Sequence, residues 1–409
     1  PITESNVPST IQGVISARVD RLEKESKQIL QEASVIGRAF IYELLFRITE
    51  LKDPIDRCLN DLKTLDLIRI RSLQPELEYI FKHALTQEAV YNGLLKKERQ
   101  AIHERIALAM EQLFRERVPE FYETLGFHFK RGRSIDRAID YLMKAGEKSL
   151  TRYAVEESHQ YYQEAYDLLA NKPAMTDEEN RLLIDLLNKW AYVFYYRGDI
   201  KGLLSLLREH EKLAESVNKA ELGMFYAWMG MGLYCGGKTK SSYEYLGKAL
   251  KTGEEIEDRR VIGYACTWLS WTCAELGLLE EAFAFGHRAQ DISRSFESDQ
   301  YLFFKSLGGL GYAYWVSGEA KKALEVGKTM CEYGERRSNI RCLAFGHWFT
   351  GWGFMLGGDF HRATECLESG IRISADPWYS GDLRVLLGMN YLFANQLDKA
   401  ETALEEALT

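Results

Sequence analysis

One stretch decides the fold, Gly311-Tyr-Ala-Tyr-Trp-Val-Ser-Gly318-Glu-Ala-Lys-Lys-Ala323, because its pattern returns as Gly351-Trp-Gly-Phe-Met-Leu-Gly-Gly358-Asp-Phe-His-Arg-Ala363. In both copies a small residue precedes a turn glycine, and an alanine follows the turn. Turns of this kind recur about every 40 residues along the second half of the chain. Their central residues are Gly198, Gly237, Gly277, Gly318, Gly358 and Asn395. Such a period predicts stacked helix–turn–helix units.

Small residues recur on both sides of each turn. Seven residues before it stand Ala191, Gly230, Ser270, Gly311, Gly351 and Gly388. Five residues after it stand Ser242, Ala282, Ala323, Ala363 and Ala400. The first repeat departs from this series, because it has Leu203 at the position five residues after its turn. Two helices approach closely only where their side chains are small, so we expect these positions to mark where paired helices cross.

This register resembles the tetratricopeptide repeat (TPR) family, whose units pair a small residue on one helix with an alanine on the next. The resemblance covers about residues 119–409 and is looser before Pro173, where we predict helices over 121–131, 134–152 and 155–170. The units are longer than the ~34 residues of a standard TPR, so their helices are expected to be about a turn longer. Repeats of this kind bury their faces by stacking, which implies a curved, right-handed superhelix.

The first 95 residues follow a different pattern. Apolar residues at helical spacing occupy 11–19 and 26–36, and a further helix is predicted over 53–65. Alternating apolar and polar residues over 67–71 and 77–82 predict a β-hairpin. Three helices and a hairpin indicate a winged-helix domain.

We therefore expect an all-α, TPR-like superhelix preceded by a small winged-helix domain. The predicted divisions are a winged helix over 1–95, a helical connector with irregular TPR-like helices over 96–172, and TPR-like repeats of about 40 residues over 173–409.

Composition limits the classes of partner. The chain of 409 residues has a formal net charge of −8 and no basic stripe. The helix that would enter a DNA groove, over 53–66, carries four aspartates against one arginine and one lysine, so nucleic acid is not an expected partner. No apolar run approaches the ~20 residues that span a bilayer, so no membrane partner is expected. The 7 cysteines lack a C-x-x-C pair and, like the 8 histidines, have no metal-ligand spacing, which favours a reducing cytoplasm and no metal site.

One motif suggests nucleotide chemistry. Gly232-Leu-Tyr-Cys-Gly-Gly-Lys-Thr239 matches the P-loop pattern G-x-x-x-x-G-K-[ST]. A P-loop needs a buried strand before it, whereas the residues before Gly232 belong to the first helix of a repeat. We interpret the match as a coincidence and expect no catalytic residue and no cofactor in this chain.

The front of the chain resembles bacterial STAND-type signalling ATPases. The resemblance covers about residues 7–115 and rests on three blocks: Val7-Pro-Ser-Thr-Ile-Gln-Gly-Val-Ile-Ser-Ala-Arg-Val-Asp-Arg-Leu22, Gln31-Glu-Ala-Ser-Val-Ile-Gly-Arg-Ala-Phe40, and Phe81-Lys-His-Ala-Leu-Thr-Gln-Glu-Ala-Val-Tyr91. In that group a nucleotide-binding domain precedes a winged helix and a helical-repeat sensor, and an adenylate or guanylate cyclase or a protein kinase can come first. The resemblance implies a parent ATPase whose Walker motifs and bound ATP or ADP lie upstream of Pro1. It also implies that His83 contacts the nucleotide phosphates, against the alternative of a histidine satisfied within the fold.

Bulky side chains follow one line of the first helices in the repeats. This line is expected to face the concave groove and includes Met231, Met389 and Phe393. The residues that we expect to bind a ligand or partner there are Tyr192, Tyr195, Tyr196, Tyr234, Tyr264, Trp271, Tyr312, Trp315, Phe345, Trp348, Trp352 and Met355. Lys305 is one of few charged exceptions. Such a groove suits a protein, an apolar peptide or a small amphipathic ligand. The alternative is that many of these rings only pack between neighbouring repeats.

The function that we predict is the regulatory and sensor region of a STAND-like signalling ATPase. An input bound in the aromatic groove would control the upstream nucleotide-binding and output domains, which are further partners of this chain. The alternative is a passive TPR scaffold or adaptor for protein–protein interaction.

Overall fold

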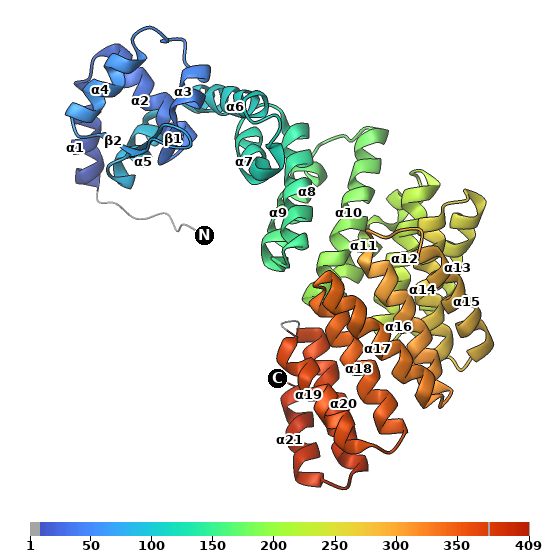
Figure 1. The fold of residues 1–409 in the computed structure, drawn as a ribbon. Coiled ribbons are helices and arrows are strands. Elements are labelled where there is room, and N and C mark those ends of the chain that lie inside the picture. Colours follow the sequence, from blue (N-terminus) through green and yellow to red (C-terminus); the bar gives the residue numbers. More distant parts are fainter. Residues whose placement is uncertain (1–8, 375–376, 409) are drawn as a thin grey trace. The chain divides into compact units, whose positions relative to one another are not determined.

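The computed structural model describes residues 9–374 and 377–408, which Figure 1 draws as ribbons. The chain forms two compact units. The first runs to Arg152 and includes Gln160–Asn171, and the second comprises Tyr153–His159 and the chain from Lys172 onward. The predicted three-part division, with borders after residues 95 and 172, stays a prediction.

The first unit combines helices with a small sheet. Its elements are α1 (Ser9–Asp20), α2 (Lys24–Ile36), β1 (Ala39–Ile41), α3 (Tyr42–Ile48), α4 (Ile55–Thr64), β2 (Ile68–Ser72), β3 (Glu78–Phe81), α5 (Ala84–Gly93), α6 (Lys96–Leu113), the 3₁₀ helix η1 (Val118–Phe121), α7 (Tyr122–Arg131), α8 (Ile135–Thr151) and most of α9 (Val155–Ala170). The last three helices begin and end within one residue of the predicted bounds.

A three-stranded antiparallel sheet in the order β1-β3-β2 lies in this unit. The predicted hairpin is confirmed as β2 and β3, with Ile70 opposite Tyr79. Sequence analysis missed β1 and α3, because elements this short show no measurable period. Pairing and packing hold β1 instead: the Phe40 ring is buried and stacks on Tyr79 with the two centroids 5.7 Å apart.

Two buried histidines meet where α6 packs on α7. The Nδ1 atoms of His103 and His128 lie 2.8 Å apart, and Tyr91 Oη lies 3.0 Å from His103 Nε2. One Nδ1 must therefore donate and the other accept, which requires at least one neutral ring. Burial lowers the pKa of His103 to about 4 and that of His128 to about 3, and the nearby Arg131 adds to both shifts.

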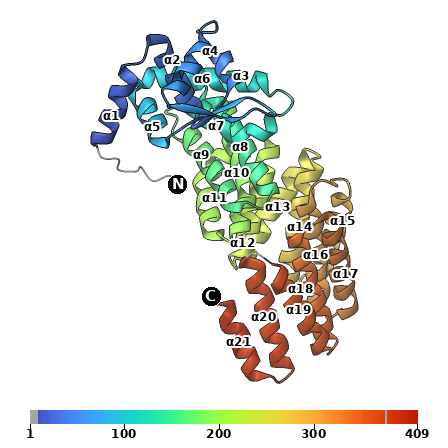
Figure 2. The same cartoon turned by 60° about the vertical axis from the view of Figure 1, so that its left-hand side comes forward.

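The second unit is an array of helix pairs, and Figures 1 and 2 show successive helices lying side by side in antiparallel order. Its helices are α10 (Asp177–Arg197), α11 (Ile200–Ala214), α12 (Lys219–Cys235), α13 (Thr239–Glu255), α14 (Arg259–Glu275), α15 (Leu279–Ser293), α16 (Gln300–Val316), α17 (Ala320–Arg337), α18 (Ile340–Leu356), α19 (Phe360–Ile373), α20 (Pro377–Phe393) and α21 (Leu397–Ala407). Among the described residues, no helix combines the length and apolar character that a membrane crossing requires.

The small residues on either side of the turns contact one another, as predicted. Ser242 Oγ donates to the Gly230 carbonyl at 2.8 Å, and Ser270 Oγ donates to the Ala282 carbonyl at 2.8 Å. The turn residues have left-handed backbones, with φ of +78° at Gly318 and 58° at Asn395. Glycine and asparagine adopt this conformation most readily, which explains why they recur there.

The P-loop match at Gly232–Thr239 lies on such a turn. Gly232 belongs to α12, which ends at Cys235, and α13 begins at Thr239. A helix therefore stands where a P-loop requires a strand, and the match is a coincidence, as predicted.

We predict that alanine at Gly327, in α17, destabilises the second unit by about 1–3 kcal/mol. A Cβ atom there would lie 2.5 Å from the Thr350 backbone nitrogen and 2.9 Å from the Gly346 carbonyl oxygen, so the backbones of α17 and α18 would have to separate. Gly247→Ala is the matched control, because that helical glycine has no neighbour within 4 Å of the new Cβ. It should gain about 0.5–1 kcal/mol from helix propensity. Urea unfolding followed by tryptophan fluorescence measures both, and equal shifts would contradict the close approach.

We also predict that acid destabilises the first unit through the histidine pair. The folded-state pKa values lie below the ordinary 6.5, so the unfolded chain binds more protons between pH 6.5 and about 4. Stability is therefore full above pH 6.5 and is lost as the pH falls, by up to about 1.4 kcal/mol per pH unit for each histidine. His128→Gln should flatten this dependence, whereas His361→Gln, at a side chain 85% exposed, should not. All 8 tryptophans lie beyond residue 172, so a circular-dichroism transition without a fluorescence change reports the first unit.

Candidate functional site

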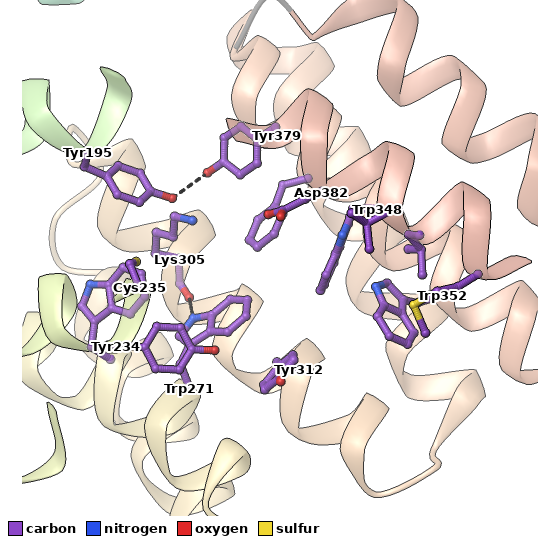
Figure 3. A pocket seen from close by; sticks show the side chains of 15 residues that line it. Tyr195, Tyr234, Cys235, Trp271, Lys305, Tyr312, Trp348, Trp352, Tyr379 and Asp382 are labelled. Atoms are coloured by element: carbon purple, nitrogen blue, oxygen red, sulfur yellow. Dashed lines mark hydrogen bonds between the residues drawn. The ribbon is translucent and has the colours of Figure 1, made fainter. Parts of the chain in front are cut away.

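A pocket of about 210 Å³ opens inside the second unit, between the first helices of the repeats. All six of these helices, α10, α12, α14, α16, α18 and α20, contribute side chains to it (Figure 3). Seven residues of the predicted groove line it: Tyr195, Tyr234, Trp271, Tyr312, Phe345, Trp348 and Trp352. The side chains are held in place by mutual packing, as where Trp271 stacks on Phe345 with ring centroids 5.8 Å apart.

Five residues of the predicted groove do not line this pocket: Tyr192, Tyr196, Tyr264, Trp315 and Met355. Tyr192 and Tyr264 hydrogen-bond to each other, and both rings pack against Trp228. Tyr264 Oη also donates to Asp299 at 2.8 Å. Packing between repeats, the alternative weighed for the groove, therefore accounts for these two tyrosines.

The other three occupy the outer layer around the pocket. The guanidinium of Arg341 covers the Tyr196 ring at 3.4 Å from its centroid. The Trp315 ring contacts Trp352 with centroids 3.7 Å apart, and Met355 is buried in the same apolar cluster as Trp352. Tyr196, Trp315 and Met355 therefore pack behind the residues that line the pocket and do not face it.

Met389 of α20 and Lys305 were expected on the groove line, whereas the rest of the α20 face, Asp382 and Cys235 were not predicted to line the pocket. The additional lining residues are Cys235, Trp268, Lys305, Tyr379, Asp382, Val385, Leu386 and Met389. Tyr379, Asp382, Leu386 and Met389 are spaced three or four residues apart, so a helical period could have placed them on one face. Nothing in the local sequence indicates that this face meets α10.

A hydrogen bond joins the first and last repeats at the rim of the pocket. The hydroxyls of Tyr195 in α10 and Tyr379 in α20 lie 3.1 Å apart, although the residues are separated by 184 positions (Figure 3). Arg341, in α18, adds a second link by donating from Nη2 to the Tyr196 carbonyl at 3.3 Å. The array of the second unit therefore returns to its own start, and α20 completes the lining of the pocket.

The pocket contains two ionisable groups of opposite sign. Lys305 is 3% exposed, and burial lowers its pKa to about 7. Asp382 lies where the pocket meets solvent. Partial loss of water around its carboxylate raises its pKa to about 6, although the charge of Lys305 opposes the shift. Burial raises the pKa of the Cys235 thiol to about 12 and that of Tyr195 well above its usual value, so both stay neutral near pH 7.

His83, the predicted nucleotide-sensing residue, lies in the first unit. It is the residue before α5, has an extended backbone and is exposed. Its role stays a prediction. Residues 7 and 8 of the first resemblance block lie outside the described residues, whereas the rest of that block falls in and around α1.

No protein-family model matches the sequence. An uncharacterized protein of Rhizobium meliloti (strain 1021) is 29% identical over 177 residues, which are 41% of this chain and 17% of that protein. This chain therefore spans only a small part of its curated relative.

One of the similar solved structures supports the repeat fold, and two others are similar more weakly. A Rap protein complexed with competence and sporulation factor superposes with a TM-score of 0.53 at 14% identity, over 66% of this chain and 76% of that one. A STAND protein with a tetratricopeptide repeat sensor from Pyrococcus horikoshii gives 0.43 at 14% identity, over 99% and 65%. NprR in complex with its cognate peptide gives 0.48 at 14% identity, over 66% and 77%. The chain is a predominantly helical protein with TPR-like repeats, and identities this low show the fold alone.

We predict that Tyr379→Phe loosens the contact between the first and last repeats. The change leaves the buried Tyr195 hydroxyl without its hydrogen bond, which costs about 1–2 kcal/mol. Backbone amides of α20 and α21 should then exchange hydrogen faster, by mass spectrometry. Tyr391→Phe is the control on the same helix, because its hydroxyl bonds to Glu368 in neighbouring α19. Equal protection in wild type and Tyr379→Phe would show that the closure contributes nothing.

Proposed function

We propose that this chain is the sensor region of a STAND-like signalling ATPase, and that its input binds in the aromatic pocket. The observation that carries the proposal is the construction of that pocket from all six first helices of the second unit. A molecule bound there contacts every repeat at once. Its binding free energy therefore acts on the curvature of the whole array rather than on one local element.

The closure between Tyr195 and Tyr379 supplies the element that an input can bias. Two arrangements of the array, one closed by this hydrogen bond and one open, differ in the contacts offered to a ligand. An input that binds the open arrangement better shifts the population toward it, by as much as its differential affinity allows. We propose that the closed arrangement is the resting state and that opening permits nucleotide exchange in an upstream domain.

The first unit supplies the connection to that domain. Helices α2 and α4 with the β2–β3 hairpin fit the predicted winged helix, which in STAND-type proteins follows the nucleotide-binding domain. His83 stands exposed at the start of α5, so its imidazole is available to donate to a phosphate oxygen of a bound ADP. The Rap protein of similar fold was solved in complex with competence and sporulation factor, which supports a signalling input for this kind of array.

We predict that two separate changes speed the release of fluorescent ADP from the whole gene product. His83→Ala should do so about 10–100-fold, since a hydrogen bond to a charged group contributes about 1.5–3 kcal/mol. Tyr379→Phe should do so about 5-fold by opening the array. His361→Ala and Tyr391→Phe are the matched controls and should leave the rate unchanged.

Three results would contradict the proposal. The first is a gene that encodes no P-loop domain upstream of this chain. The second is release of ADP from His83→Ala at the wild-type rate, and the third is an unaltered rate in Tyr379→Phe. A partner complex that forms equally with and without nucleotide would instead support a passive adaptor.

A further inference from the structure

Lys305 places a buried cation in an aromatic cage. Its Nζ lies within 6 Å of six ring centroids, at 4.4 Å from that of Phe345, 4.9 Å from that of Tyr195 and 5.1 Å from that of Tyr379. Aromatic faces attract a cation, so they offset part of the cost of burying the ammonium, although burial still lowers its pKa to about 7. They do not accept the directed hydrogen bonds that its three N–H groups can donate.

The described part of the chain supplies no hydrogen-bond acceptor or close ion pair for this ammonium. Asp382 lines the same pocket but makes no contact with Nζ within 4.0 Å in the described structure, and Figure 3 shows it on the side of Lys305 that faces Trp348. The thiol of Cys235 and the phenols of Tyr195 and Tyr234 are neutral because burial raises their pKa values, so they supply no negative charge to balance the ammonium. A hydrogen-bond acceptor for this ammonium therefore comes from water or from a bound molecule.

The shape and lining of the pocket limit what can bring that acceptor. A cavity of about 150 Å³ accommodates benzene, so one of about 210 Å³ has room for one ring system or a short aliphatic chain with a polar end. Trp271, Phe345 and Trp348 offer flat apolar faces for such a body. A second anionic group is disfavoured, because it would approach the Asp382 carboxylate.

We propose that the pocket binds a small monocarboxylate with an aromatic or aliphatic body, and that the Lys305 ammonium pairs with its carboxylate. This inference rests on the proposed sensor function and names the class of its input. Burial strengthens such a pair, because the aromatic walls exclude the water that would otherwise compete. A carboxylate at Lys305 also lies beside the rings of Tyr195 and Tyr379, so it can accept from their hydroxyls and replace the bond that joins the first and last repeats.

Direct binding to this chain tests the proposal. Three acids, 3-indolepropionate, 4-phenylbutyrate and octanoate, are titrated by calorimetry and compared with the corresponding neutral amides. At least one acid should bind about 10–100-fold more tightly than its amide, which is the range of a charge-assisted hydrogen bond. In Lys305→Met this preference should fall to within about 2-fold. Because methionine keeps the length and removes the buried charge, the variant should unfold at no lower temperature than wild type.

Lys248→Met is the matched control. Its ammonium also lies over aromatic rings, at 4.6 Å from the Tyr245 centroid and 5.2 Å from the Tyr226 centroid, but its side chain lies on an exposed face outside the pocket. It should retain the full preference for the acid. Should Lys305→Met fail to fold, the comparison of acid with amide on the wild-type chain still decides.

Three outcomes would overturn the proposal. One is that none of the three acids binds with a Kd below roughly 10 mM. The others are equal affinity for acid and amide, and an undiminished preference for the acid in Lys305→Met. Binding of an apolar peptide together with the absence of acid binding would overturn it as well. That last result would leave the sensor function standing, since ADP release from the whole gene product measures it independently.

Discussion

Close contact between helix backbones is the constraint on which the second unit depends. A small residue on the first helix of each pair lets the second helix cross at short range, as where Ser242 reaches the Gly230 carbonyl. Between α17 and α18 the approach is so close that Gly327 has no space for a Cβ atom. Helix α17 is the second helix of one pair and α18 the first of the next, so close approach occurs between pairs as well as within them. Large side chains of the first helices lie away from these crossings and line the pocket. The aromatic interior is the result.

That interior differs from a simple apolar core in one respect. It contains Lys305, whose burial is costly, and Asp382 at the boundary with solvent. A core selected only for stability would replace a buried cation by an apolar side chain of similar volume. The lysine and the pocket around it therefore point to binding, while the Tyr192, Trp228 and Tyr264 cluster next to it serves packing.

How much could be predicted from the sequence follows from the range of the interactions. The helix pairs, their turns and their crossings depend on residues about twelve positions apart, and six copies of one pattern reveal them. The pocket depends on Tyr379 meeting Tyr195 across 184 positions, and no local period encodes that contact. Seven lining residues could be predicted because they share a helix face, whereas the contact of α20 with α10 and the burial of Lys305 became visible only in three dimensions.

The return of α20 to α10 also bears on how such a protein can evolve. An open solenoid tolerates duplication or loss of a repeat, because each unit touches only its neighbours. In this chain an added or a deleted repeat would move Tyr379 out of hydrogen-bond distance of Tyr195. Gain or loss of a repeat would therefore break the contact that completes the pocket, whereas side chains can change within the same frame.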